Sequence, residues 1–197
     1  MDSDSIEAAR TYIREIFAGN AGGHDVSHSL RVYQNALAIA REEPACDPEV
    51  VALAALLHDV DDYKLFDTRN NAHARAFLES RQISPEKAEE ILSAINSVSF
   101  SQNRGRRPET PEGRIVQDAD RLDAIGAVGI ARTFAYGGEH GRSMEETVAH
   151  FHEKLLLLRD EMNTPTARRM AEERHRFMVD YLAELERETG IQAADRN

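Results

Sequence analysis

The stretch from Val50 to Asp62, VVALAALLHDVDD, limits what this chain can fold into more than any other part of the sequence. Its first eight residues are all apolar, and a helix that is apolar on every side belongs in a protein core. His58 and Asp59 follow at once, and Asp61 and Asp62 come next. The stretch is either a buried helix with an ordinary polar end or a core helix that positions a metal or catalytic groups. His-Asp pairs are common, so the stretch alone favours the first interpretation.

The rest of the chain predicts an all-α fold. Four pairs combine an N-capping residue with a proline that suits the first helical position: Asp47-Pro48, Ser84-Pro85, Thr110-Pro111 and Thr164-Pro165. No stretch alternates apolar and polar residues between hairpin turns. We therefore predict a single-domain helical bundle of about seven to nine helices. Within it, Leu30, Tyr33 and Leu37 are expected on the buried face of the second helix, and Phe177 on that of the last.

Composition excludes several classes of function. A formal charge of −11 makes the chain a poor binder of nucleic acid polymers or anionic membranes, but does not exclude a small phosphorylated ligand. Its apolar runs are too short to cross a bilayer. The N-terminal MDSDSIEAAR lacks the apolar core of a secretory signal, and Cys46 is the single cysteine, so we expect a cytoplasmic protein. Either a monomer or a homodimer fits these data.

Four residues on three predicted helices suit a metal site: His28, His58, Asp59 and Asp120. Two imidazoles and two carboxylates form a mixed nitrogen and oxygen set that binds Mn²⁺, Fe²⁺, Co²⁺ or Zn²⁺. Each residue also has an ordinary explanation. His28 could be a core or capping histidine, and Asp120 one of several acids on a solvated face. Spacing alone does not choose between them.

The context of these residues resembles the HD-domain superfamily of metal-dependent phosphohydrolases. The matching segments are 24–32 (HDVSHSLRV), 56–60 (LLHDV) and 118–122 (DADRL). Alignment of the last segment makes Asp120 the ligand rather than Asp118. The resemblance implies a metal-site core of about residues 24–125, with helices of about 126–190 packing on the same core of a single domain, 1–197.

The match is closer to one subgroup, the YedJ/YpgQ-like proteins, which carry features like 125–132 (IGAVGIAR) and 150–155 (HFHEKL). The superfamily implies one divalent metal ion, Mn²⁺ first, with Co²⁺, Fe²⁺, Mg²⁺, Ni²⁺ or Zn²⁺ as alternatives. The subgroup implies hydrolysis of nucleoside or deoxynucleoside triphosphates to the monophosphate and pyrophosphate. The alternatives are a nucleoside 5′-monophosphatase, a cyclic-nucleotide phosphodiesterase, and a metal- and nucleotide-binding sensor without fast turnover.

Asp62 is the candidate for handling the attacking water. It lies four residues after His58 and three after Asp59, so a continued helical turn places it on their side. Acids at this position have that role in many relatives. The competing candidate is Asp61, and a solvated carboxylate at the end of a helix is the ordinary explanation of Asp62. Asp59 is expected to act in catalysis as a ligand of the metal.

Substrate phosphate needs cations. Arg31 lies three residues after His28 and could bind a phosphate bidentately or pair with a carboxylate. Weaker candidates of the same kind are Lys64, Arg121, Arg132 and Lys154, and Arg121 could instead tie its helix to a neighbour. His24 is expected either to support the metal ligands or to line the pocket, and the basic loop at 101–113 is either an exposed linker or an arm that meets phosphate. The remaining histidines lack an acidic context and are given no role: His73, His140, His150, His152 and His175.

Overall fold

The computed structural model describes residues 3–18, 25–63, 65–98 and 106–191, and every regular element in these residues is helical. The α-helices are α1 (Ser3–Ile16), α2 (Val26–Ala40), α3 (Pro48–Leu57), α4 (Ala72–Ser80), α5 (Pro85–Asn96), α6 (Pro111–Asp123), α7 (Gly126–Glu139), α8 (Met144–Glu153) and α9 (Pro165–Thr189). A 3₁₀ helix, η1 (Leu155–Glu161), follows α8. The predicted all-α class is confirmed. In the described part of the chain, no helix is long and apolar enough to span a bilayer.

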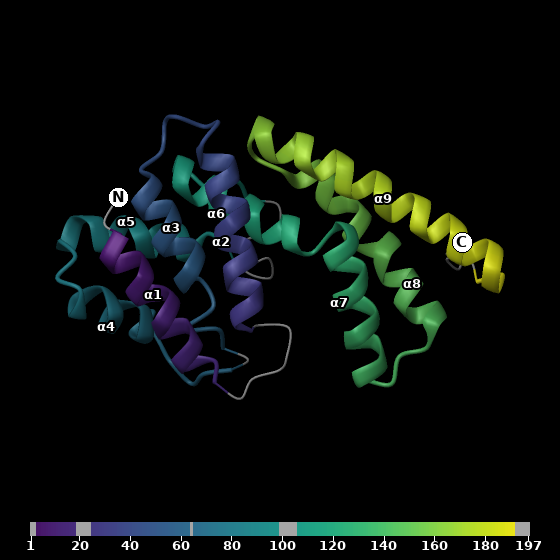
Figure 1. Cartoon of the computed structure of the whole chain (residues 1–197), viewed down its shortest axis with the longest axis horizontal. Helices are drawn as coiled ribbons and strands as arrows, with labels where there is room; N and C mark the ends of the chain where they lie inside the picture. Colours follow the sequence, from purple (N-terminus) through teal and green to yellow (C-terminus); the bar gives the residue numbers. More distant parts are fainter. Residues whose placement is uncertain (1–2, 19–24, 64, 99–105, 192–197) are drawn as a thin grey trace. The chain divides into compact units, whose positions relative to one another are not determined.

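The chain forms two compact units, Met1–Asp120 and Arg121–Asn197 (Figure 1). The first contains α1 to α5 and most of α6, and the second contains α7, α8, η1 and α9. In the second unit α9 packs against α7 and η1. That residues 126–190 share one core with the first unit stays a prediction.

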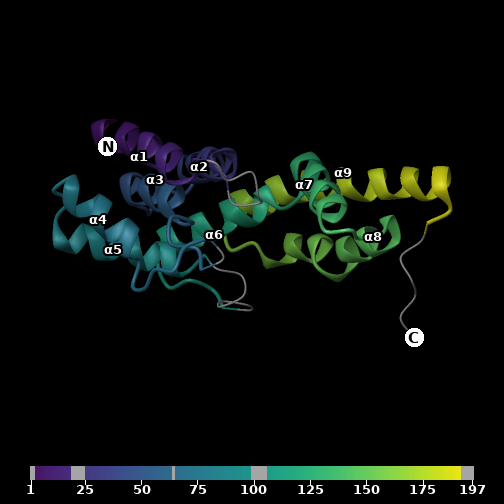
Figure 2. The ribbon, with the colours of Figure 1, turned by 90° about the horizontal axis from the view of Figure 1, so that it is seen from below.

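Helix α3 is the core of the first unit. Each residue from Val50 to Leu57 is at most 1% exposed. Helices α1, α2 and α5 all pack against α3, which lies between the α1–α2 pair and the α4–α5 pair (Figure 2). This explains why α3 is apolar on every side, and it places the residues at its C-terminal end among three other helices.

The predicted helix starts are confirmed. Asp47, Ser84, Thr110 and Thr164 each accept a hydrogen bond from a backbone N–H in the first turn of the helix that follows. Asp47 is the N-cap with the most hydrogen bonds among these four. Its Oδ1 accepts from Glu49 N at 2.8 Å, and its own N–H donates to Glu112 Oε1 at 2.8 Å.

Two predicted helix faces are wrong by a small rotation. Phe177 on α9 is 51% exposed, and the neighbouring Met178 is buried instead. On α2 the predicted Leu30 and Leu37 are only half-buried. The buried face of that helix carries polar residues as well as apolar ones: His28, Ser29, Val32, Tyr33, Asn35, Ala36 and Ile39.

We expect Asp47→Ala to lower the free energy of unfolding by about 0.5–2 kcal/mol, because the variant loses the N-cap of the core helix. The pKa of Asp47 is lowered: burial alone would raise it, but the N–H of Glu49 and the ammonium of Lys87, 3.2 Å away, outweigh burial. A carboxyl group with a lowered folded-state pKa stabilises the fold above its unfolded value of about 3.9. The difference from wild type should therefore shrink as the pH falls below about 4.

Urea unfolding at pH 7 and at a series of acidic pH values measures this difference. The matched control is Glu15→Ala, at an exposed site on α1, which should change stability by less than about 0.5 kcal/mol. A loss in Asp47→Ala that grows as the pH falls would contradict the assigned role of this carboxylate.

Candidate metal centre

His28 is positioned by the start of α2. Asp25 is the N-cap of this helix, and its Oδ1 accepts a hydrogen bond from His28 N at 2.7 Å. The His28 side chain is 4% exposed. The cap therefore fixes the backbone from which the buried imidazole extends.

His58 and Asp59 lie where α3 ends. His58 is the C-cap of α3, and its ring Nδ1 lies 2.9 Å from the carbonyl oxygen of Ala55. Because a carbonyl oxygen only accepts, Nδ1 of His58 carries the proton and Nε2 is left with a lone pair. This arrangement, an imidazole fixed through one nitrogen so that the other can ligate, is the one found around protein metal ions.

Asp120 is presented by α6, which is held by two buried side chains. Asn35 of α2 donates from Nδ2 to the carbonyl of Ala119 at 3.2 Å. One turn earlier in α6, Gln117 donates from Nε2 to the carbonyl of Ser97 at 2.8 Å. Both bonds attach the turn of α6 that bears Asp120 to neighbouring helices of the first unit.

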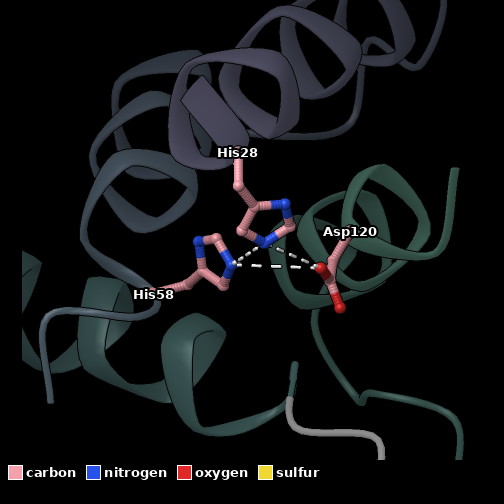
Figure 3. A group of neighbouring side chains, drawn as sticks. All are labelled: His28, His58 and Asp120. Carbon is pink, nitrogen blue, oxygen red and sulfur yellow. Dashed lines mark hydrogen bonds and ion pairs between the residues drawn. The ribbon is translucent and has the colours of Figure 1, made fainter. Parts of the chain in front are cut away.

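The four predicted ligands meet at one place. The ligand atoms of His28, His58 and Asp120 all lie within 4.8 Å of one another (Figure 3). The two imidazole Nε2 atoms are 3.3 Å apart, and Asp120 Oδ1 lies 3.3 Å from that of His28 and 4.0 Å from that of His58. Asp59 Oδ2 joins them at 3.4 Å from His28 Nε2 and 3.3 Å from His58 Nε2.

Most of these separations fit ligands of one small divalent ion; the 4.0 Å between Asp120 Oδ1 and His58 Nε2 is wider. Ligands about 2.1 Å from a metal and about 90–109° apart lie about 3.0–3.4 Å from each other. Two imidazole nitrogens and two carboxylate oxygens also provide the mixed donor set that transition metals bind. The side chains of His28, His58 and Asp59 are at most 10% exposed, whereas that of Asp120 is 28% exposed. The cluster is therefore enclosed on the histidine side and reaches solvent beside Asp120.

The electrostatics of the cluster favour a cation. Burial alone would lower the pKa of His58, but the carboxylates of Asp59 and Asp120 outweigh burial and raise it. Burial would raise the pKa of Asp120, but the hydrogen bond and charge of His28 outweigh it and lower that pKa. Both shifts reflect attraction between the carboxylates and protonated imidazoles. The same carboxylates would attract a divalent ion once the imidazoles are neutral.

Asp62 follows the cluster in a tightened turn rather than in a continued α-helix. Helix α3 ends at Leu57, and i to i+3 hydrogen bonds follow, from Val60 N to Leu57 O and from Asp62 N to Asp59 O, at 3.2 and 3.0 Å. In such a turn, residues i and i+3 lie one above the other. Asp59 and Asp62 are thus the pair expected on one side. Asp61 is engaged elsewhere, because its carboxylate accepts from two backbone N–H groups of α4.

The predicted substrate contacts are only partly placed. Arg31 lies half-buried on α2, one turn after His28. Arg121 binds within the second unit, where its guanidinium donates to the Glu161 carbonyl and lies 3.3 Å from the Glu161 carboxylate. Lys154, the C-cap of α8, is also in that unit. His24, Lys64 and residues 101–105 of the basic loop lie outside the described residues.

No sequence pattern singles out His73 or Asn35, yet both bond to segments that carry metal-site residues. The ring Nδ1 of His73 lies 2.8 Å from the carbonyl oxygen of Val60, next to Asp59. Asn35 holds the residue that precedes Asp120. Neither partner is near in sequence, so no local pattern could have revealed these bonds.

Comparisons with known proteins agree with this site. Residues 25–125 match the model of the HD domain family. The chain is 42% identical to the YpgQ protein of Bacillus subtilis over 95% of each chain. The crystal structure of that YpgQ in complex with ADP has a TM-score of 0.83 and 41% identity, covering 95% of this chain and all of that one. The crystal structure of an HD-superfamily hydrolase from Bacillus thuringiensis has a TM-score of 0.79 and 37% identity, covering 96% of this chain and 98% of that one.

The chain belongs to the HD-domain family. The predicted resemblance is confirmed by the family match, by the similarity to YpgQ and by solved structures described as HD-superfamily hydrolases. The protein is an enzyme of this hydrolase superfamily.

We expect the purified protein to bind one divalent ion per chain, and His28→Ala, His58→Ala and Asp120→Ala each to weaken Mn²⁺ binding by more than about 100-fold. Loss of a residue that merely supports a ligand costs about 10–100-fold, and loss of a ligand should exceed that. Calorimetric titration of the metal-free protein measures the affinity. The control is His152→Ala, on an exposed position of α8. Equal affinities in the control and the three variants would refute the site.

Proposed function

We propose that this protein is a metal-dependent phosphohydrolase that acts on nucleoside triphosphates and releases pyrophosphate. The observation that carries the proposal is the convergence of His28, His58, Asp59 and Asp120, with three of these side chains enclosed and Asp120 at the solvent side. A structural metal site is closed by its protein ligands, whereas a hydrolytic site needs access for water and substrate.

Mn²⁺ is the ion we propose for this cluster. When bound, a divalent ion lowers the pKa of a coordinated water and polarises a phosphoryl oxygen. The chain itself fixes the ligands: Ala55 holds the His58 ring, Asp25 holds the backbone of His28, and Asn35 holds the turn before Asp120.

Asp62 is proposed to accept the proton of the attacking water. Its backbone is held on both sides, since its N–H donates to Asp59 O and its carbonyl accepts from Leu65 N and Phe66 N, both at 2.9 Å. A general base must keep a fixed position relative to the proton that it removes. Of the two neighbouring acids, Asp61 already binds backbone N–H groups with both carboxylate oxygens. This supports Asp62 over Asp61 as the base.

A nucleotide is the proposed substrate because YpgQ, 41% identical over nearly the whole chain, has been crystallised with ADP. Phosphates of such a ligand need cationic partners, since their charge spreads over the equatorial oxygens during transfer. We propose Arg31 as the principal phosphate contact, with His24 and Lys64 as further contacts. Arg121, which binds Glu161, and Lys154, in the second unit, are not among them. We also propose a cytoplasmic protein, monomeric or homodimeric, that acts on free nucleotides rather than on polymers or membranes.

The test of the proposed reaction is release of phosphate and pyrophosphate from a panel of nucleoside triphosphates and monophosphates with Mn²⁺. We expect pyrophosphate from triphosphates, abolished by EDTA and by Asp59→Ala but not by Asp160→Ala, at a 69% exposed carboxylate. Orthophosphate from monophosphates would identify a nucleotidase, and hydrolysis of cyclic nucleotides a phosphodiesterase. Metal binding without turnover on any of these substrates would identify a sensor.

We expect Asp62→Asn to lower kcat by about 10²–10⁴, because an amide cannot take up the proton that a general base removes. Mn²⁺ affinity should stay at the wild-type value, because Asp62 is not proposed as a ligand. Steady-state kinetics and metal titration on the same preparation measure both quantities, with Asp160→Asn as the matched control. A kcat equal to that of wild type would remove Asp62 from the mechanism.

A further inference from the structure

We propose that Asp61 and His73 form a positioning pair, called here the Asp61–His73 clamp, which holds the turn bearing His58, Asp59 and Asp62 in the conformation that binds metal. The effect on turnover rests on the proposed function, whereas the effect on metal binding does not.

The first half of the clamp is an N-cap supplied from outside the helix. Asn71, the residue at the N-cap position of α4, has a left-handed backbone (φ 55°, ψ 47°) and makes no side-chain capping bond. The carboxylate of Asp61 replaces that cap. Its Oδ1 accepts from His73 N at 3.0 Å, and its Oδ2 accepts from Ala74 N at 2.9 Å. A carboxylate at a helix N-terminus is also favoured by the helix dipole.

The second half of the clamp runs in the opposite direction. The ring Nδ1 of His73 lies 2.8 Å from the carbonyl oxygen of Val60, which can only accept. His73 therefore donates a hydrogen bond to the turn that follows α3, where backbone carbonyls no longer have helical partners. The turn after α3 thus provides an acceptor for the free N–H groups of α4, and α4 provides a donor for a free carbonyl of that turn.

The carboxylate half of the clamp is mostly shielded from water, whereas the His73 side chain is 34% exposed. The Asp61 side chain is only 9% exposed. The ring of Phe66 packs edge-on against that of His73, with centroids 5.1 Å apart, and the hydroxyl of Tyr12 donates to the His73 carbonyl at 3.3 Å. Hydrogen bonds in such a setting are stronger than in water, and an unpaired group there is costly. The clamp therefore constrains the turn rather than merely touching it.

The position of the clamp in the chain gives it a function. Asp61 stands between the ligand Asp59 and the proposed base Asp62, and Val60 joins Asp59 to Asp61. Rotation of this turn would move the Asp59 carboxylate away from the two imidazoles, which lie 3.3 and 3.4 Å from it. Partners that orient a ligand typically contribute about 10–100-fold to metal affinity or activity. The three acids therefore have separate functions: ligation for Asp59, positioning for Asp61 and proton transfer for Asp62.

The test compares His73→Ala, which loses the donor to Val60, with His73→Asn, whose amide nitrogen can occupy the place of Nδ1. The control is Tyr12→Phe, which removes a hydrogen bond to the same residue but leaves the clamp intact. For His73→Ala we expect Mn²⁺ affinity to fall about 10–100-fold and the amides of Val60 and Asp62 to exchange hydrogen faster. His73→Asn should recover most of both losses, and Tyr12→Phe should behave as wild type.

A second variant, Asp61→Ala, tests the other half of the clamp and should lower Mn²⁺ affinity in the same way. In turnover, His73→Ala should lower kcat with little change in KM. The clamp is refuted if His73→Ala leaves both Mn²⁺ affinity and amide exchange at wild-type values. It is also refuted if His73→Asn is as impaired as His73→Ala, or if Tyr12→Phe is equally impaired. Titration and exchange need no substrate, so wild-type protein that binds metal without turnover would contradict the proposed function alone.

Discussion

The rest of the first unit depends on one constraint: four polar ligand groups must meet at a single, mostly buried place. Buried polar groups are costly unless each has a partner, and carboxylates near each other repel. The chain meets this requirement by fixing three of the four groups, or the backbone beside them, with hydrogen bonds from residues outside the cluster. Asp25 holds the backbone of His28, Ala55 holds the ring of His58, and Asn35 holds the turn before Asp120. A divalent ion would then complete a set of groups that are already oriented.

Helix α3 makes this convergence geometrically feasible. Because Val50–Leu57 are buried on all sides, α3 is in contact with α1, α2 and α5 together. Any group at its C-terminal end is therefore delivered into the space between several helices instead of to solvent. His58 and Asp59 occupy that end. The apolar run therefore buries the helix, and the His-Asp pair at its end lies where its side chains can meet ligands from other helices.

Much of this could be predicted from the sequence, because the signals are local. The apolar run predicts a core helix, and the capping pairs predict where helices begin. The prediction of the buried face of α2 was wrong because it considered apolar residues alone. Asn35 is buried there through a bond to Ala119, 84 positions away in sequence. The bonds of Asp61 to His73 and Ala74 were missed for the same reason. These partners lie 12 and 13 positions away, a spacing that no helical or turn period predicts.

The turn after α3 shows why adjacent residues of the same type need not share a chemical role. Asp59, Asp61 and Asp62 have the same side chain within four positions, and only the backbone distinguishes them. Helix α3 ends at Leu57, and the turn then tightens to i to i+3 bonds, so Asp59 and Asp62 are expected on one side. Asp61, out of phase with both, faces the N-terminus of α4 and binds its N–H groups. The change of helical period at one point therefore separates the metal ligand and the proposed base from the residue that supports them.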